Sequence, residues 1–195
     1  ARYNYIPKHI PAKVRSKAKF NLSRVKEIES TVQHDVIAFL TNLAEYVGRD
    51  GRYVHFGLTS SDILDTALAL KLKEVSEIII NYLKELLKVL KKKANEHKLT
   101  LMVGRSHGVH AEPITFGLKA ALFYAEFERN LVRFERAAES VAYGKISGAV
   151  GTFANVNPKV EAYVCQKLGL KPAPISTQIL QRDRHAEYLT TIAII

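Results

Sequence analysis

The sequence predicts an all-α fold, an elongated bundle of long helices. Apolar residues recur at spacings of four and three from Leu64 to Ala94, and a second seam of the same kind extends from Phe116 to Val141. At about 1.5 Å per residue, the first helix is roughly 50 Å long. Helices of this length cannot bury their seams in a small globule, so we expect them to pack as a bundle. No strand pattern of convincing length appears, although residues 99–103 could form a short extended piece.

The N-terminal part predicts one helix before the first seam. Residues 1–20 are basic and show no sustained period. Asn21 can cap a helix over about residues 22–47, and Gly48 is a typical helix stop. A loop with two glycines follows over residues 49–58.

The two long helices have recognisable starts. Ser60 or Ser61 can cap the first, and Asp62 places a negative charge in its first turn, where the helix dipole favours it. We expect the second to begin at Pro113, because a proline in the first position sacrifices no hydrogen bond, and to end at Gly144.

The C-terminal part contains a loop and two shorter helices. The loop covers residues 145–156. Asn157-Pro158 predicts the start of a short helix and Gly169 its end. A last helical pattern begins near Gln181 and is still apolar and uncapped at Ile195. We therefore expect the chain to stop inside an element and to be a fragment of a longer protein.

Length and composition set the frame. The chain has 195 residues, 47% of them apolar and 25% charged, which is ordinary for a soluble globular protein. We expect two partial domains, an N-terminal helical domain over residues 1–60 and a central long-helix bundle domain over residues 61–195. No apolar run could span a membrane, and no secretory signal is visible. The single cysteine, Cys165, excludes an internal disulfide framework and fits a cytoplasmic location.

The charge balance raises the question of a nucleic-acid partner. The formal net charge is +10, but lysines and arginines are spread along the helices, and the densest cluster, Lys91-Lys92-Lys93, lies near a helix C-terminus that favours cations. No zinc-ligand spacing, glycine clamp or aromatic-rich strand motif accompanies the charge. We therefore expect neither nucleic acid nor membrane as a partner.

The segment over residues 104–117 is the richest in chemistry. Two histidines, an arginine, a glutamate and two hydroxyls lie between the two long helices, and Gly104 and Gly108 allow sharp turns on either side of His107. A helix–helix linker needs turn residues but not this density of titratable groups. Polar side chains concentrated at the end of a rigid scaffold are typical of an active site.

Four further polar clusters occur at predicted helix ends or loops. They are Gln33-His34-Asp35, the run from His55 to Asp62, the glycine-spaced loop over residues 145–152, and the segment over residues 176–185. Solvent exposure, helix capping or loop formation explains each one separately. A helix start with free N–H groups and hydroxyls also binds carboxylate or phosphate, and the glycine-spaced loop could cradle an anion, although its spacing is not that of a P-loop.

Taken together and in this order, the five segments resemble the adenylosuccinate lyases, a family within the fumarase/aspartase superfamily. The runs from Gly104 to Pro113 and from Leu180 to His185 look specific to that family. The resemblance extends from about residue 20 to the end of the chain. It implies a fumarase/aspartase-like bundle of long helices, in agreement with the periodicity.

The resemblance implies a β-elimination of fumarate. Adenylosuccinate would give AMP, and the succinylaminoimidazole carboxamide ribotide of purine synthesis (SAICAR) would give its carboxamide product (AICAR). A base removes a proton from the succinyl carbon next to a carboxylate, and an acid protonates the departing nitrogen. The family needs no metal and no organic cofactor.

Residue roles also follow from the resemblance. His107 corresponds to the acid, and a histidine can hold or release a proton near neutral pH. The hydroxyl-bearing helix start suits a dianionic succinyl group. The residues that match substrate contacts are Gln33, His34, Asp35, His55, Thr59, Ser60, Ser106 and Gln178.

Two family features are not found in the sequence. The serine-rich mobile loop that carries the base serine is missing, and we expect it beyond Ile195. A phosphate-binding Arg-Tyr pair resembles Arg2-Tyr3, but this pair lies too close to Pro7, so we expect the true pair upstream. The family assembles its sites from three subunits of a homotetramer. We therefore expect sites shared between subunits and no activity from this fragment alone.

Two alternatives have to be weighed. Another lyase of the superfamily, of the argininosuccinate or fumarate type, would share the fold, but the run from Gln181 to His185 argues against it. A non-catalytic structural homologue would have no use for His34, His107 and Gln178 together.

Overall fold

The computed structural model describes residue 1 and residues 3–195, so that Arg2 of the Arg2-Tyr3 pair lies outside the described residues. The chain forms two compact units. Unit 1 comprises Ala1–Thr66 and Gly144–Leu180, and unit 2 comprises Ala67–Tyr143 and Gln181–Ile195. Because residues 144–180 join the N-terminal residues here, this grouping differs from a simple division after residue 60, and the two-domain assignment stays a prediction.

Unit 1 is built from short helices and loops around the start of one long helix. In chain order it contains α1 (Ile10–Lys17), α2 (Leu22–Val32), α3 (Asp35–Val47), the 3₁₀ helix η1 (Gly48–Tyr53), the start of α4 (Ser60–Glu96) and α6 (Pro158–Leu168). The two-residue strands β3 (Tyr143–Gly144) and β4 (Lys171–Pro172) pair with each other, and the Gly144 carbonyl accepts a hydrogen bond from Ala173.

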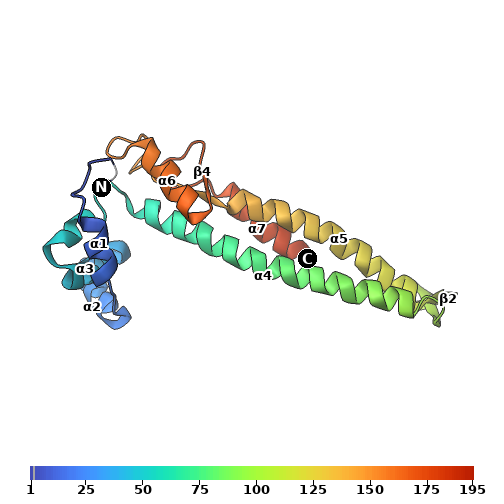
Figure 1. Ribbon diagram of the computed structural model, residues 1–195. Coiled ribbons are helices and arrows are strands. Elements are labelled where there is room, and N and C mark those ends of the chain that lie inside the picture. Colours follow the sequence, from blue (N-terminus) through green and yellow to red (C-terminus); the bar gives the residue numbers. More distant parts are fainter. Residues whose placement is uncertain (2) are drawn as a thin grey trace. The chain divides into compact units, whose positions relative to one another are not determined.

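Unit 2 is a bundle of long helices closed by a hairpin (Figure 1). It contains most of α4, the antiparallel strands β1 (Leu101–Ser106) and β2 (Val109–Thr115), α5 (Phe116–Val141) and α7 (Asp183–Ile194). Its core is formed by Leu83, Phe134, Ala137, Val141 and Tyr188. The hydroxyls of Ser76 and Tyr188 lie 3.0 Å apart inside this core and satisfy each other.

The all-α class and several helix ends are confirmed. Asn21 caps α2 by accepting from Arg24 N–H, and Gly48 ends α3. Asn157 caps α6, and Gly169 closes it in the left-handed region, with φ 65°. These residues act through their own backbone or side chain within one helical turn, which is why sequence alone identified them.

The predicted helix over residues 22–47 is wrong in one respect, because it is two helices. Gln33 adopts a left-handed φ of 54° and ends α2, and His34 is extended and begins α3. Both helices present an apolar face, so the periodicity continued across the break. The helix α1 was also not predicted, since its eight residues bury only Ile10 and show little period.

The start of α5 is the second correction. Pro113 lies in β2, opposite Val103, and α5 begins at Phe116 with Thr115 as its cap. The extended piece expected near residues 99–103 is therefore the first strand of a hairpin. Two smaller corrections concern helix ends. Ser60 was expected as a cap, but it is already helical, and Thr59 precedes α4. Gly144 was expected to end α5, but α5 ends at Val141 and Gly144 lies in β3.

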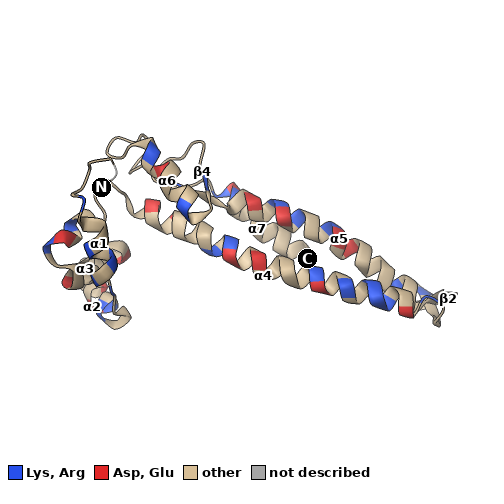
Figure 2. Ribbon diagram, in the orientation of Figure 1, with Lys and Arg blue, Asp and Glu red and all other residues tan. Residues whose placement is uncertain are grey.

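The charged residues follow the helices. Figure 2 shows lysines and arginines interleaved with acidic residues along α4 and α5, and basic residues gathered near the C-terminal end of α4. Many of the pairs join side chains three positions apart on exposed helix faces, such as Lys71–Glu74 and Lys88–Glu85. Such pairs contribute little to stability. Among the described residues, no helix is long and apolar enough to cross a membrane.

Candidate active site

The hairpin of unit 2 presents His107 at its tip. Ser106 pairs with Val109, so that His107 and Gly108 are the two turn residues, with φ values of 52° and 79°. Positive φ at both positions is typical of a type I′ turn, whose backbone is unstrained for glycine and accessible to histidine at a modest energetic cost. The turn thus places His107 at the tip of the hairpin, and Ser106 and His107 are both exposed.

The hairpin itself is narrow at Gly104. A β-carbon at this position would lie 2.3 Å from the carbonyl oxygen of Glu112 on the facing strand, so only glycine fits. The strand pairing is irregular between Val103 and Arg105. Gly104 therefore serves the close approach of two strands, and Gly108 alone serves the turn beside His107.

The break between α2 and α3 fixes the second histidine. The Gln33 side-chain amide donates to the Ser30 carbonyl at 2.7 Å, which ties it back to α2. The Nδ1 atom of His34 accepts from Ile37 N–H at 3.4 Å, as a helix cap, and lies 3.3 Å from Asp35 Oδ1. Both contacts use Nδ1, so Nε2 of this half-exposed ring is the atom available to a ligand.

The two contacts of Nδ1 require opposite tautomers of His34. Accepting from Ile37 N–H requires an unprotonated Nδ1, which places the proton of a neutral ring on Nε2, whereas a hydrogen bond to the Asp35 carboxylate requires the proton on Nδ1. Nε2 is a donor toward a ligand in the first tautomer and an acceptor in the second.

His55 lies beside the same helix. It lines a cavity of about 380 Å³ together with Ile37, Thr41 and Ala44 of α3. Its Nε2 atom is buried and has no hydrogen-bond partner among the described residues. Buried polar atoms are usually satisfied, so an unpaired nitrogen beside a cavity is a candidate ligand contact.

Thr59 and Ser60 stand at the N-terminus of α4 and are half-buried. The Asp62 carboxylate reaches back and accepts from Thr59 N–H at 2.9 Å, which fixes the chain entering the helix. Gln178 is exposed, but the residues two positions on either side, Ser176 and Leu180, are buried. The side chains of Thr59, Ser60 and Gln178 are thus carried by backbone that hydrogen bonds or buried neighbours hold in place.

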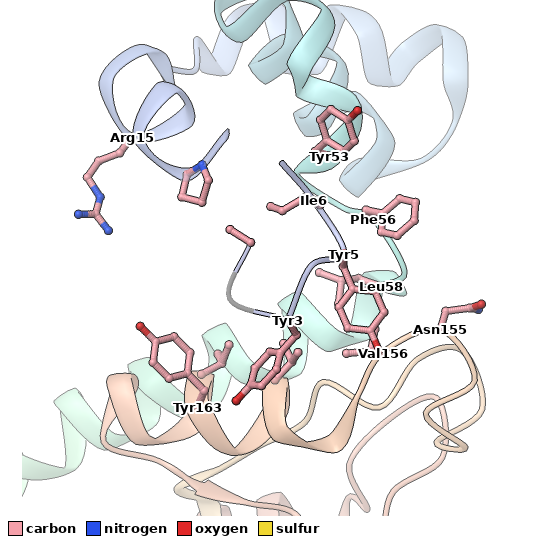
Figure 3. A pocket seen from close by; sticks show the side chains of 14 residues that line it. Tyr3, Tyr5, Ile6, Arg15, Tyr53, Phe56, Leu58, Asn155, Val156 and Tyr163 are labelled. Carbon is pink, nitrogen blue, oxygen red and sulfur yellow. The ribbon is translucent and has the colours of Figure 1, made fainter. Parts of the chain in front are cut away.

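Unit 1 also holds an aromatic cavity of about 480 Å³ (Figure 3). Rings from the N-terminal segment, from the chain before α4 and from α6 surround it, and Arg15 is the one cationic side chain among the described residues that line it. None of the predicted substrate-contacting residues lines this cavity, although Phe56 and Leu58, from the same run as His55 and Thr59, do.

The predicted site residues divide between the units. Unit 1 contains Gln33, His34, Asp35, His55, Thr59, Ser60 and Gln178, and unit 2 contains Ser106 and His107. Within unit 2, part of the distinctive run from Gln181 to His185 has a structural task. Arg184 stacks on the ring of Tyr143 at 3.9 Å and donates to the Ser140 carbonyl, which holds α7 against α5.

The loop over residues 145–152 does cradle an anion, and that anion belongs to the protein. The Asp62 carboxylate accepts hydrogen bonds from Lys145 Nζ and from the N–H groups of Ser147 and Gly148. Sequence reasoning placed Asp62 in the first turn of a helix and treated the loop separately, so it missed the contact between them. The only available signal in the sequence was the glycine spacing of the loop, which is typical of anion-binding loops.

A second buried carboxylate lies behind this loop. Glu161 of α6 accepts from Ile146 N–H at 2.7 Å and is 5% exposed. Burial raises the pKa of the Glu161 carboxyl, although the Ile146 hydrogen bond and the charge of Lys145 oppose the shift. Burial and the nearby Glu161 charge likewise raise the pKa of the Cys165 thiol to about 11, so this cysteine is a packed side chain and not a nucleophile. Among the described residues, no group of three or more His, Cys, Asp or Glu side chains could hold a metal ion.

With this geometry in view, the comparison with protein families is decisive. The family model described as "Lyase" matches residues 3–195. The chain belongs to this lyase family. Solved lyase-like structures share the fold: a fumarate lyase from Mesorhizobium sp. BNC1 superposes with a TM-score of 0.92 and 30% identity, covering 100% of this chain and 47% of that one.

Curated relatives of this lyase chain are closer in sequence. An adenylosuccinate lyase of Synechocystis sp. is 57% identical, and one of Bacillus subtilis is 53% identical, each over 195 residues. Both matches cover 100% of this chain and 45% of the relative, so the chain spans less than half the length of these relatives. A 3-carboxy-cis,cis-muconate lactonizing enzyme from Pseudomonas putida has the same fold, with a TM-score of 0.90 and 25% identity, over 99% of this chain and 46% of that one. The fold therefore does not by itself decide the chemistry.

Proposed function

We propose that the protein containing this chain is an adenylosuccinate lyase. It releases fumarate from adenylosuccinate to give AMP, and from SAICAR to give AICAR, in purine biosynthesis. The observation that carries the proposal is the 57% identity, over the whole of the chain, to a relative of that name. All five polar segments lie inside this match.

The reaction moves protons and breaks one carbon–nitrogen bond. A base takes the proton from the succinyl carbon next to a carboxylate, and the C–H electrons become the double bond of fumarate. The C–N bond breaks with its electron pair on nitrogen, which an acid protonates. We assign the acid to His107, whose turn presents an exposed imidazole. The base, a serine by family resemblance, is expected in the part of the relatives that this chain does not cover. No metal or organic cofactor takes part in these steps.

The remaining residues are proposed to bind the substrate. In its Nε2-protonated tautomer, His34 offers its Nε2–H to an anionic group, and Thr59 and Ser60 offer hydroxyls at the positive end of the α4 dipole. Gln178 supplies an exposed amide. The other members of the set are Gln33, Asp35, His55 and Ser106.

We further propose a homotetramer in the cytoplasm, with sites shared between subunits. The support is an exposed apolar stripe on α4, in which Leu68, Val75, Tyr82 and Val89 recur every seven residues. Tyr82 is 73% exposed and Val89 is 55% exposed, and a run of such residues marks an interface. Leu83, about 100° around α4 from Tyr82, is covered within the chain.

The resemblance to a family whose sites combine residues from three subunits also supports sharing. Of the predicted residues, Thr59 and Ser60 lie in unit 1, and Ser106 and His107 lie in unit 2.

The test of the activity is a direct assay of the full-length protein. Loss of the succinyl-purine absorbance and appearance of fumarate are expected with adenylosuccinate and with SAICAR. Argininosuccinate is the control substrate and should not be cleaved. Robust cleavage of argininosuccinate without cleavage of adenylosuccinate would assign the protein to another branch of the superfamily, and no cleavage of either would favour a structural homologue.

The test of shared sites is complementation. Full-length variants His34→Ala and His107→Ala should each be inactive, and mixing them should restore part of the activity, because some mixed tetramers contain an intact site. Light scattering should give the mass of a tetramer. A monomeric mass, or no recovery under conditions in which labelled subunits exchange, contradicts the arrangement.

A further inference from the structure

We propose that Asp62 and Lys145 are positioning residues that hold the chain segments carrying Thr59, Ser60 and Gln178 in one arrangement. The inference rests on the proposed function for what these segments bind. The arrangement itself is visible within unit 1 and involves no residue outside it.

The two charges form the buried centre of unit 1. Asp62 and Lys145 are both 0% exposed, and Lys145 Nζ donates to Asp62 Oδ1 and to the Gly148 carbonyl. Neither side chain can touch a substrate from this position. Any effect on the reaction must therefore pass through the groups that they hold.

The Asp62 carboxylate joins two separate pieces of chain. Its Oδ2 atom accepts from Thr59 N–H at 2.9 Å, on the chain that enters α4, and from Gly148 N–H at 3.2 Å. Its Oδ1 atom accepts from Ser147 N–H at 3.1 Å. One turn further along α4, the Thr66 hydroxyl exchanges hydrogen bonds with the backbone of Lys145. The start of α4 and the loop after β3 are thereby fixed to each other.

The loop in turn holds the segment with Gln178. The hydroxyls of Ser147 and Ser176 lie 2.8 Å apart and are buried. A β-carbon on Gly151 would lie 2.0 Å from the Ser176 carbonyl oxygen, so the two backbones are in direct contact. On the other side of Gln178, Leu180 N–H donates to Asp65 Oδ2 at 2.8 Å. Gln178 is therefore an exposed amide on a short segment that is anchored at both ends.

Energetics explain why charged residues fill this place. A buried ion pair contributes little net stability compared with well-packed apolar residues, but it tolerates only one geometry, and losing one partner leaves a costly unpaired charge. An apolar core here would also leave the N–H groups of Thr59, Ser147 and Gly148 without acceptors. The pair thus specifies how three segments meet more than it stabilises the unit.

The experiment uses full-length protein with Lys145→Met, Asp62→Asn and the double variant. Lys145→Met leaves a buried carboxylate unpaired, whereas the double variant is neutral and retains a side-chain oxygen for the N–H groups. Tyr188→Phe is the control, since it also removes a buried polar contact, that with Ser76, but in unit 2. Ser147→Ala is a milder second variant that cuts only the link to Ser176.

Two readouts separate positioning from simple loss of stability. Hydrogen exchange of the free protein should be faster in Lys145→Met at residues 57–60, 146–151 and 176–180 together, and in Ser147→Ala mainly at residues 176–180. With adenylosuccinate, kcat/KM of Lys145→Met should fall about a hundredfold, mostly through KM, because misplacement by an ångström has effects of that size. The double variant should recover part of both losses, and Tyr188→Phe should show neither.

The outcomes distinguish the two proposals. If exchange accelerates in the three segments but KM and kcat stay at their normal values, the positioning role is wrong. The same holds if kcat/KM falls only in proportion to the folded fraction of the protein, as in Tyr188→Phe. If exchange changes in one segment alone, the coupling is wrong. Wild-type protein that does not cleave adenylosuccinate refutes the proposed function, and exchange then decides the coupling by itself. If Lys145→Met does not fold, the same criteria of hydrogen exchange, KM and kcat are applied to Ser147→Ala.

Discussion

The tip of the hairpin and the Asp62–Lys145 centre are built in opposite ways. His107 lies on a two-residue turn, is exposed, and has a positive φ of 52°. Asp62 and Lys145 are fully buried, and the carboxylate receives hydrogen bonds from the side chain of Lys145 and from three backbone N–H groups. One region presents a titratable group with little around it, and the other surrounds its charges completely.

The difference shows how this fold separates chemistry from support. An exposed group on a tight turn can be changed without disturbing a core, so its removal should affect reaction much more than folding. A buried charge that joins several segments cannot be changed without disturbing them all. We therefore expect substitutions at the hairpin tip to affect activity more than stability, and substitutions at the Asp62–Lys145 centre to affect stability as well.

The largest expected effect is on activity at the hairpin tip. In the full-length protein, His107→Ala should lower kcat by about a hundred- to ten-thousand-fold, the usual contribution of a general acid, while substrate still binds. The unfolding midpoint should hardly change, because the side chain is exposed. His107→Asn is the sharper variant, since Asn-Gly is a preferred type I′ turn and should keep or stabilise the hairpin while losing the acid. Near-normal turnover in either variant removes His107 from the mechanism.

A pair of glycines tests the comparison through stability. Gly108 and Gly151 have similar positive φ values, 79° and 81°, but nothing lies within 4 Å of a β-carbon on Gly108, whereas the Ser176 backbone blocks one on Gly151. Gly108→Ala should lower the free energy of unfolding by about 1–2 kcal/mol, the cost of the left-handed backbone. Gly151→Ala should lower it by about 3–5 kcal/mol. Denaturant unfolding measures both, and equal losses would show that the loop yields as easily as the hairpin.

The smallest expected effect is a pH dependence behind the loop. Because burial raises the pKa of Glu161 above its usual 4.5, folding favours its protonated form, and the resulting stability is present below about pH 4.5 and lost as pH rises through the folded pKa. Glu161→Gln cannot ionise and retains an oxygen for Ile146 N–H. Its melting temperature relative to wild type should therefore be higher at about pH 8 than at about pH 4. The exposed Glu74→Gln serves as control and should show no such trend. A difference for Glu161→Gln that is constant with pH contradicts the assignment.

The long helices were predictable because their signals are local and repeated. The seam of α4 extends over its whole length, and Asn157 and Gly169 bracket α6 by capping chemistry that acts within one turn. The hairpin was not predictable in the same way. Its strands are almost entirely exposed and show no alternation of buried and exposed residues, and Pro113 imitates a helix start.

The site was predictable in its parts and not in its arrangement. The polar clusters around His34, His55 and His107 stand out in the sequence. The break at Gln33 does not, because a left-handed glutamine is uncommon and both flanking helices have continuous apolar faces. The seam of α4 was also taken as one face, whereas Leu83 is buried in the chain and Leu68 and Val75 are exposed.

The sequence by itself determined the helical class, several helix ends and the identity of the polar groups, since periodicity and capping depend on residues a few positions apart. Only the tertiary structure decided that Asp62 meets Lys145, 83 positions further along the chain, and that Ser147 meets Ser176, because no local rule relates residues so far apart. A buried carboxylate must find donors wherever the fold brings them. For that reason the loop over residues 145–152, whose sequence suggested a site for an external anion, binds the carboxylate of Asp62 from its own chain.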